Sequence, residues 1–335
     1  MLRPAGRLFP YGMLFVAAAL FLSSTPHRAR PDDAEPPVTF LFTWGQKGKA
    51  DGEFDAPIGI AINAEDELYI SDFRNNRVQK FSADGKFLLK FAVAEMPGGI
   101  AVDRQKRIYV APLMSHKVCV YNEQGELLRE WGKLGTGDGE FEQPGGIAIA
   151  SDGTVYVADQ VNRRVQRFDA EGRFLGKWGE YGTNPGQFDG VENLKNRTGG
   201  PNFVALDTKG NVYTTEAKLG RIQRFTADGK PLFAFGNNST DPGGFGGRPK
   251  NLPGPIGVCV DRYGRIWVTS TNNRLQLFSP DGKLLFGFEN LEPGTEPKRF
   301  HTPHGMVIDS KGHLYVVDSQ NYRIQKFAVP GLEGR

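Results

Sequence analysis

One stretch, Pro144–Gly179, carries the pattern on which the whole chain is built: PGGIAIASDGTVYVADQVNRRVQRFDAEGRFLGKWG. The same pattern recurs along the chain. Its copies start at Pro57, Pro97, Pro144, Pro201, Pro255 and Pro303. An aromatic residue follows twelve positions after each of these prolines, namely Tyr69, Tyr109, Tyr156, Tyr213, Trp267 and Tyr315. A repeat of this kind indicates a series of equivalent structural units that bury their apolar faces against one another.

Each copy contains four strand signals. In the third copy they are GGIAIA at 145–150, TVYVAD at 154–159, RVQRFD at 164–169 and RFLGKWG at 173–179. Short alternating segments joined by turns such as Ser151-Asp152-Gly153 are typical of antiparallel hairpins. The sequence therefore predicts an all-β fold, a six-bladed β-propeller of four-stranded antiparallel blades.

The two ends of the repeat region predict how the ring closes. The sixth copy reaches Pro330-Gly331 and stops where the other copies enter their fourth strand. Val38–Gly45 (VTFLFTWG) matches the end of a copy. We expect this N-terminal strand, 38–45, to complete the last blade with Trp44 on it, which removes two open sheet edges. The propeller is expected over 38–331, with blades starting near 57, 97, 144, 201, 255 and 303.

The residues before the repeats have a different character. Arg3 and Arg7 precede an apolar run, and a Pro-rich polar stretch follows it. This order predicts a signal peptide or an N-terminal membrane anchor over 1–29, with residues 8–22 as its apolar part and 30–37 as a linker. Both alternatives predict that the propeller is exported, either periplasmic, extracellular or membrane-anchored.

Composition excludes some functions. Charged residues are 24% of the chain and the net charge is +3, so the basic excess of a typical nucleic-acid binder is missing. Nucleic acid is not an expected partner. The two cysteines, Cys119 and Cys259, fall at different phases of the repeat, which predicts neither a disulfide nor a metal site.

The repeat resembles a known family. PIGIAINAEDELYISDFRNNRVQKF at 57–81 and PGGIAIASDGTVYVADQVNRRVQRF at 144–168 are similar to the NHL repeat, P-x-G-[IV]-A-[VI]-x-x-x-G-x-[IVL]-[YW]-[VI]-x-[DS]-x-x-N-x-R-[IV]-x-x-F. The resemblance covers Val38 to about Gly331 and implies the six-bladed propeller. It implies no single activity, because NHL propellers include lyases, RNA binders, sensor domains and protein-interaction modules.

Strand order predicts which loops share a face. The loop before the first strand of a blade and the loop between its second and third strands lie at one end. The loops before the first strand vary greatly in length, with long examples at 180–200, 237–254 and 290–302. Long loops on one rim of a rigid scaffold favour that face for ligand binding.

Two regular features of the repeat predict structural roles. The motif Asp-x-x-Asn-x-Arg recurs in half of the blades, so we expect its Asp and Asn to hold the loop and its Arg to bridge neighbouring blades. The residues that form it are Asp72, Asn75, Arg77, Asp159, Asn162, Arg164, Asp318, Asn321 and Arg323. The basic residues Arg167, Arg224 and Lys326 alternate with apolar ones, which predicts a solvated strand face.

Departures from the repeat mark the candidate site. The residue after each starting proline is expected to look toward the mouth of the axis, and in the last blade it is His304. The candidate ligand-binding residues on this face are His304, His301, Arg299, His116, Asn202, Glu216 and Lys218. Catalytic residues stay unassigned.

One NHL enzyme class, peptidyl-hydroxyglycine amidating lyase, is similar in fold and takes zinc-ligand histidines from the post-proline position of three blades. Here His304 alone matches that position. Three-histidine zinc is therefore not expected, and neither is a cofactor. The favoured function is a binding scaffold for a protein, peptide, glycan or small ligand. The alternative is a lyase-type or hydrolytic enzyme with an axial site near His304.

Overall fold

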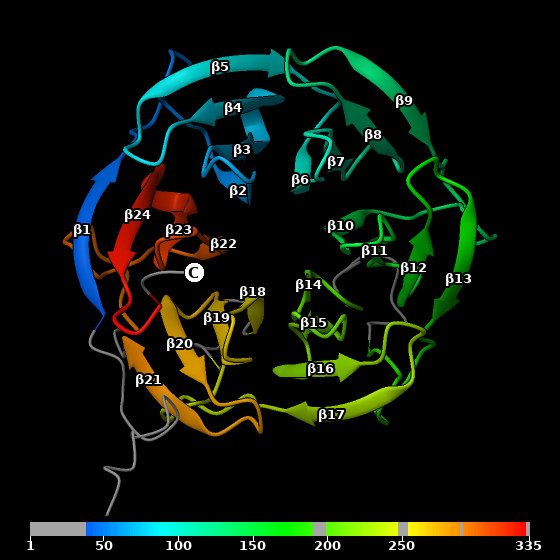
Figure 1. The fold of residues 1–335 in the computed structure, drawn as a ribbon. Helices are drawn as coiled ribbons and strands as arrows, with labels where there is room; N and C mark the ends of the chain where they lie inside the picture. The colour runs from blue at the N-terminus through cyan, green and yellow to red at the C-terminus, as the bar shows by residue number, and fades with distance from the viewer. Residues whose placement is uncertain (1–37, 190–198, 247–253, 289–290, 333–335) are drawn as a thin grey trace, which may run out of the picture.

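The computed structural model describes residues 38–189, 199–246, 254–288 and 291–332. Within them, 24 strands form six four-stranded antiparallel sheets. Figure 1 shows these sheets arranged as blades around a central axis, with the first strand of each blade innermost. The predicted all-β, six-bladed propeller is confirmed.

The strands repeat in four concentric sets. The inner strands are β2 (Pro57–Ile62), β6 (Pro97–Val102), β10 (Pro144–Ile149), β14 (Val204–Leu206), β18 (Pro255–Val260) and β22 (Pro303–Ile308). The second strands are β3 (Leu68–Asp72), β7 (Ile108–Pro112), β11 (Val155–Asp159), β15 (Val212–Glu216), β19 (Ile266–Ser270) and β23 (His313–Asp318).

The third and outer strands complete each blade. The third strands are β4 (Arg77–Phe81), β8 (Val118–Tyr121), β12 (Arg164–Phe168), β16 (Arg221–Phe225), β20 (Arg274–Phe278) and β24 (Arg323–Ala328). The outer strands are β5 (Phe87–Ala92), β9 (Leu127–Trp131), β13 (Phe174–Trp178), β17 (Pro231–Phe235), β21 (Leu284–Phe288) and β1 (Thr39–Trp44). Short 3₁₀ turns, η2 (Phe73–Asn75) and η3 (Ser319–Asn321), follow β3 and β23.

The ring closes as the sequence predicts. Strand β1 pairs antiparallel with β24, from Thr39 opposite Ala328 to Trp44 opposite Ile324. The last blade therefore joins one N-terminal strand to three C-terminal strands. Since every outer strand is then paired on its inner side, no blade lacks its fourth strand.

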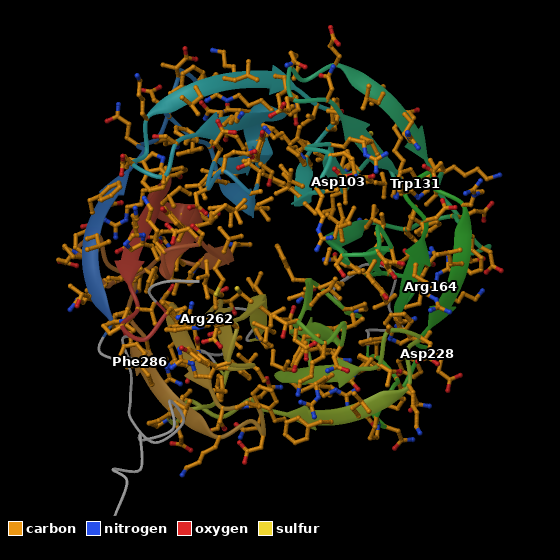
Figure 2. The ribbon with its side chains drawn as sticks, viewed as in Figure 1. Asp103, Trp131, Arg164, Asp228, Arg262 and Phe286 are labelled. Carbon is orange, nitrogen blue, oxygen red and sulfur yellow. The ribbon has the colours of Figure 1, made fainter. Side chains whose placement is uncertain are left out.

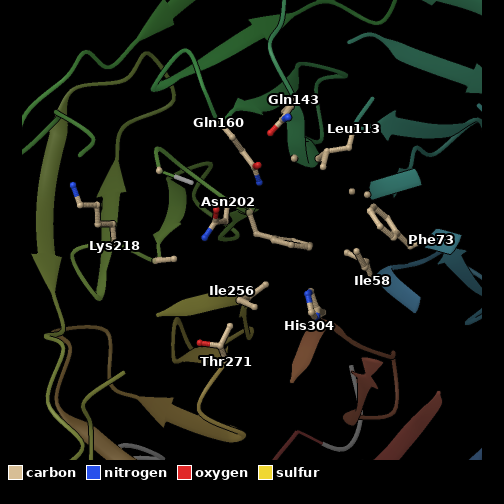
Figure 3. Close-up of a pocket in the computed structure, with 16 residues that line it drawn as sticks. Ile58, Phe73, Leu113, Gln143, Gln160, Asn202, Lys218, Ile256, Thr271 and His304 are labelled. Atoms are coloured by element: carbon tan, nitrogen blue, oxygen red, sulfur yellow. The ribbon is translucent and has the colours of Figure 1, made fainter. Parts of the chain in front are cut away.

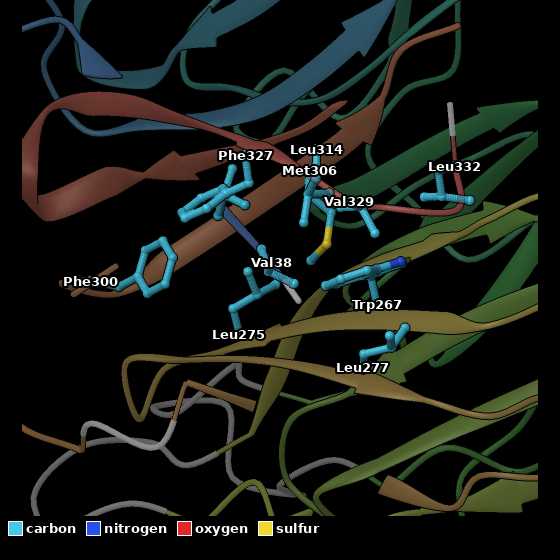
Figure 4. Packing of buried hydrophobic residues seen from close by; sticks show 11 residues of the cluster. Val38, Trp267, Leu275, Leu277, Phe300, Met306, Leu314, Phe327, Val329 and Leu332 are labelled. Carbon is cyan, nitrogen blue, oxygen red and sulfur yellow. The ribbon is translucent and has the colours of Figure 1, made fainter. Parts of the chain in front are cut away.

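Apolar side chains of neighbouring blades pack together in buried clusters, and Figure 2 shows side chains projecting from every blade. The repeated aromatics Tyr69, Tyr109, Tyr213 and Tyr315 are at most 1% exposed. Figure 4 shows the cluster beside the seam, where Val38 packs with Trp267 of the fifth blade and with Phe327 and Leu332 of the chain's end. Burial between blades, rather than within one sheet, is what holds the ring together.

The predicted solvated strand face is wrong for Lys326 and holds in part for Arg167 and Arg224, which stay partly exposed. Arg167, Arg224 and Lys326 reach across to carbonyl oxygens in turns of the next blade, at Ala227, Pro280 and Ala83 respectively. Lys326 is only 5% exposed, and burial lowers the pKa of its ammonium group. Alternation along a strand indicates which residues share a face, but the neighbouring blade decides whether that face meets water.

The loops that precede the inner strands, called incoming loops from here on, share a feature that the repeat pattern did not predict. Five of them contribute a phenylalanine whose side chain is fully buried: Phe54, Phe141, Phe188, Phe245 and Phe300. Bridges such as Lys47 with Phe54 and Leu134 with Phe141 give these loops a common shape. Even the long loops therefore begin as regular parts of the propeller.

The expected signal peptide or anchor (1–29, apolar part 8–22) and the linker (30–37) lie outside the described residues, as do 190–198 and 247–253 of two long loops. In the described part of the chain, no helix is long and apolar enough to span a membrane. Cys119 and Cys259 are both free thiols, and burial raises their pKa to about 11 and about 12.

Candidate functional site

The Asp-x-x-Asn-x-Arg motif holds the incoming loops, as predicted. In the third blade, Asp159 is fully buried and accepts hydrogen bonds from the Glu142 N–H and from Arg164 Nε, each at 2.8 Å. The guanidinium of Arg164 (labelled in Figure 2) then donates to the loop carbonyls of Thr136 and Gly137. We call this aspartate–arginine arrangement the loop clamp. Its equivalents use Asp72 with Arg77 and Asp318 with Arg323.

Glu216, a candidate ligand-binding residue, occupies the aspartate position of a loop clamp in the fourth blade. Its side chain is fully buried, accepts from the Asp189 N–H at 2.6 Å and pairs with Arg221 Nε at 2.6 Å. Arg221 in turn donates to the carbonyls of Thr183 and Gln187. Glu216 therefore makes the same contacts as the aspartate of the other loop clamps. It does not line the cavity described below.

His116 has a comparable place in the second blade. It sits in a left-handed turn with φ of +53°, and its Nδ1 accepts a hydrogen bond from the Gln143 N–H at 3.1 Å. The amide oxygen of Asn76 makes the same contact with the N–H of Met96 in the blade before it. His116 therefore supports the residue that precedes Pro144, and its ring is not part of the cavity wall.

A cavity of about 390 Å³ opens at the axial mouth, on the face that the sequence favoured (Figure 3). Its wall combines post-proline residues with residues from the loops between second and third strands, so these two sets share one end of the propeller. Its apolar side chains are Ile58, Phe73, Leu113, Phe203, Ala217 and Ile256. Its polar side chains are Gln143, Gln160, Asn202, Lys218, Thr271 and His304. An apolar wall with a few polar groups is typical of a small-ligand site.

His304 projects into this cavity from the start of β22 (Figure 3). Its Nδ1 lies 2.9 Å from the carbonyl oxygen of Thr302, and since a carbonyl only accepts, Nδ1 carries the ring proton. Nε2 is then an acceptor in the neutral ring. Burial lowers the pKa of His304 below its usual range, and the bond to Thr302 opposes that shift only in part. The carbonyl of His304 itself accepts a bond from the Thr269 hydroxyl of the fifth blade, which fixes its backbone.

Asn202 and Lys218 also line the cavity. Asn202 stands after Pro201, across the mouth from His304, while Lys218 lies at the rim (Figure 3). The Lys218 ammonium is 3.2 Å from the Asp189 carboxylate, so its charge is balanced locally. Of the seven candidate residues, the structure brings three, His304, Asn202 and Lys218, to one cavity.

The last two candidates lie in the incoming loop of the sixth blade. Arg299 donates to the Glu292 carbonyl at 3.2 Å, and its own carbonyl receives bonds from Arg323 and Gln325. The His301 N–H donates to Asp318 Oδ1 at 2.8 Å. Both are parts of a loop clamp, outside the cavity wall.

The arrangement of potential metal ligands can be stated for the described ranges. Within them, no group of three or more His, Cys, Asp or Glu side chains is placed to hold a metal ion. Among the described residues that line the cavity, His304 and Lys218 are the titratable ones, and none of these residues carries a carboxylate. The described part of the wall therefore offers apolar surface, amide groups, one hydroxyl, one imidazole and the Lys218 ammonium, which is paired with Asp189.

Sequence comparisons agree with this architecture. Residues 54–81 and 300–327 match the NHL repeat, and residues 96–178 match a family described as a 6-bladed β-propeller. Peptidyl-glycine alpha-amidating monooxygenase B of Xenopus laevis is 31% identical over 134 residues, which are 38% of this chain and 15% of that protein. NHL repeat-containing protein 3 of Homo sapiens is 35% identical over 83 residues, 24% of this chain and 23% of that protein. The chain thus covers less than a quarter of either relative.

Solved structures share the fold over much more of the chain. A streptogramin B lyase has a TM-score of 0.59 and 15% identity, covering 87% of this chain and 98% of that one. A gluconolactonase from Xanthomonas campestris has a TM-score of 0.58 and 19% identity, covering 90% and 97%. At such identities the likeness is one of fold alone.

Proposed function

From the premise that this chain belongs to the NHL-repeat β-propellers, we propose that it is a binding scaffold whose ligand site is the cavity at the axial mouth. The observation that carries the proposal is the make-up of the cavity wall. Ile58, Leu113 and Ile256 offer apolar surface, and amide side chains such as Asn202 offer hydrogen bonds. The ligand class that suits it is amphipathic and uncharged, with amide or hydroxyl groups beside an apolar part, as in a peptide or a small organic molecule.

The electrostatics of the cavity support an uncharged ligand. Lys218 is paired with Asp189, and His304 is neutral at pH 7 because burial lowers its pKa. Single-stranded nucleic acid is disfavoured, because it requires a basic groove with aromatic stacking surfaces. We further propose that the N-terminal segment exports the propeller or tethers it to a membrane, so that the ligand is met outside the cytoplasm.

The test fills the cavity without touching its polar groups. Isothermal titration calorimetry would measure binding of N-acetylated amino-acid amides and dipeptide amides to the wild-type protein and to Ile256→Trp. We expect amides with branched apolar side chains to bind, and the bulky indole to weaken that binding at least tenfold. Leu128→Trp, on the exposed outer strand β9, is the matched control and should bind as wild type does. Equal affinities of Ile256→Trp and wild type would place the ligand elsewhere and refute the proposal.

A second candidate, a lyase-type or hydrolytic enzyme, is favoured by one observation. His304 lines a mostly apolar cavity, and because its Nδ1–H is held by the Thr302 carbonyl, its Nε2 is unprotonated in the neutral ring, which suits a general base. The variant His304→Gln, which keeps a polar group of similar size, distinguishes an enzyme from a binding scaffold. An enzyme loses turnover of a bound amide or ester in this variant, whereas a scaffold shows no turnover in either form.

A further inference from the structure

The repeat is broken at one position beside the axis, and the break adds an aromatic ring. The second residue after the starting proline is glycine in five blades: Gly59, Gly99, Gly146, Gly257 and Gly305. In the fourth blade it is Phe203. The glycines are required by close approach of neighbouring inner strands, since a Cβ at Gly99 would lie 2.4 Å from the Gly145 carbonyl oxygen.

The inner strand of the fourth blade is shorter than the others, and Phe203 lies just before it. Strand β14 covers only Val204–Leu206, whereas every other inner strand begins at its proline. The Phe203 backbone still makes the regular contact of this position: its N–H donates to the Thr215 hydroxyl at 3.0 Å, as the Gly59 N–H does to Ser71. Its ring packs partly against the apolar cluster between the fourth and fifth blades. A defined backbone with a partly packed ring gives Phe203 a fixed place at the axis.

Phe203 lines two cavities. One is the mouth cavity of about 390 Å³, and the other is an axial cavity of about 340 Å³ between the inner strands. Gly99 is the other described residue that lines both, and it has no side chain. Phe203 is therefore the one described residue with a side chain that lines both spaces.

The two spaces differ in chemistry. The mouth is walled by side chains, but the axial cavity is walled by inner strands that each pair on one side only. The unpaired edge of each inner strand faces the axis, and its N–H and C=O groups need hydrogen-bond partners such as water. A ligand that passes Phe203 would move from the mouth cavity into a space whose wall adds backbone N–H and C=O groups to apolar side chains such as Ile62 and Val307.

We propose that Phe203 is the floor of the mouth cavity and a specificity-determining residue that limits the length of the ligand. This inference rests on the proposed function, because it concerns the same cavity. With the ring in place, the ligand's apolar part ends at the floor. Without the ring, the mouth joins the axial cavity and longer apolar chains fit.

The test uses leucinamides carrying straight N-acyl chains of two to ten carbons, with calorimetry on the wild-type protein and on Phe203→Ala. In the wild type, affinity is expected to rise by about fourfold per added methylene until the cavity is filled, and then to fall. In Phe203→Ala the affinity should start to fall at an acyl chain at least two carbons longer than in the wild type. We call the chain length at which affinity starts to fall the cut-off, and Phe203→Leu should have an intermediate one. Thermal unfolding would report misfolding of Phe203→Ala, and in that case Phe203→Leu still tests the proposal.

The matched control is Leu113→Ala, which enlarges the mouth cavity without opening it toward the axis. Its cut-off length should stay within one carbon of the wild type. If Phe203→Ala has the wild-type cut-off, or if Leu113→Ala shifts the cut-off equally, Phe203 is not the floor.

A ligand-free measurement separates this inference from the proposed function. Xenon binds apolar cavities, so crystals under xenon pressure should hold it on the mouth side of Phe203 in the wild type and also at the vacated ring position in Phe203→Ala. An unchanged xenon distribution overturns the inference. If no acyl amide binds the wild type, the proposed function fails, while the xenon result still decides the role of Phe203.

Discussion

Single polar residues that break the repeat have two different roles. His304 and Asn202 face the cavity, whereas Glu216 and His116 replace the regular residues of a structural contact with side chains of different length. The sequence singles out all four in the same way. Only the contacts of each side chain separate a residue that faces a ligand site from one that holds a loop.

The titration of His304 gives the first test at this scale. Burial lowers its pKa, so the ring should titrate below pH 6.5 in the folded protein and near 6.5 in the unfolded chain. Between these two values the unfolded chain binds more protons, so stability contributed by the neutral ring is present above 6.5 and falls as pH decreases toward the folded pKa. NMR titration of the ring measures the pKa directly, and His304→Gln should lack this slope. A folded pKa at or above 6.5 would contradict the expectation.

Glu216 provides the second test. Glu216→Ala removes the partner of Arg221, whose side chain is mostly buried, and should lower the free energy of unfolding by about 3–5 kcal/mol. The exposed pair of Lys177 with Asp138 is the control, since Asp138→Ala should cost less than about 1 kcal/mol. Urea denaturation measures both. If Glu216→Ala keeps wild-type stability but no longer binds ligand, the structural role is wrong and Glu216 is a ligand-binding residue.

At the scale of elements, the seam between β1 and β24 is, among the described strands, the place where sequence-distant strands complete a blade. The Thr43 hydroxyl donates to the Ile324 carbonyl at 2.7 Å, and the Trp44 ring lies 6.0 Å from Phe81 and 6.2 Å from Tyr315. These rings join the last blade to the first. The seam is therefore held by packing between blades as well as by strand pairing.

Substituting the aromatic residue at the seam should lower the free energy of unfolding of the propeller. Trp44→Ala leaves a cavity against Phe81 and Tyr315, and because Trp44 is only half-buried the expected loss is about 2–4 kcal/mol of unfolding free energy. Leu41 lies on the same strand and is 41% exposed, so Leu41→Ala should change stability by less than about 1 kcal/mol. Equal effects of the two substitutions in urea unfolding would show that the aromatic contacts do not hold the seam.

At the scale of the molecule, the cavity belongs to the whole ring. Every blade contributes to its wall, from Ile58 in the first blade to His304 in the sixth. No single repeat contains the site, although each repeat is nearly the same structure. The site therefore exists only when the seam is closed and all six blades stand in register.

Export is tested on the full chain. Expressed in a bacterial host, the complete sequence should fractionate with the periplasm or the membrane, whereas a chain that begins at Val38 should stay in the cytoplasm. Immunoblotting of the separated fractions measures both, with a cytoplasmic and a periplasmic marker protein as controls. Recovery of the full chain only in the cytoplasmic fraction would refute the proposed export.

The sequence by itself determined the number of blades, the strand order, the seam and the face that carries the cavity. These features follow from local patterns, since alternation, turns and starting prolines repeat in every copy, and Val38–Gly45 matches the end of a copy. The role of Glu216, the burial of Lys326 and the position of Phe203 between two cavities were decided only by the tertiary structure. Each depends on atoms contributed by another blade or by a loop distant in the chain, and a local pattern carries no information about which neighbour a side chain will meet.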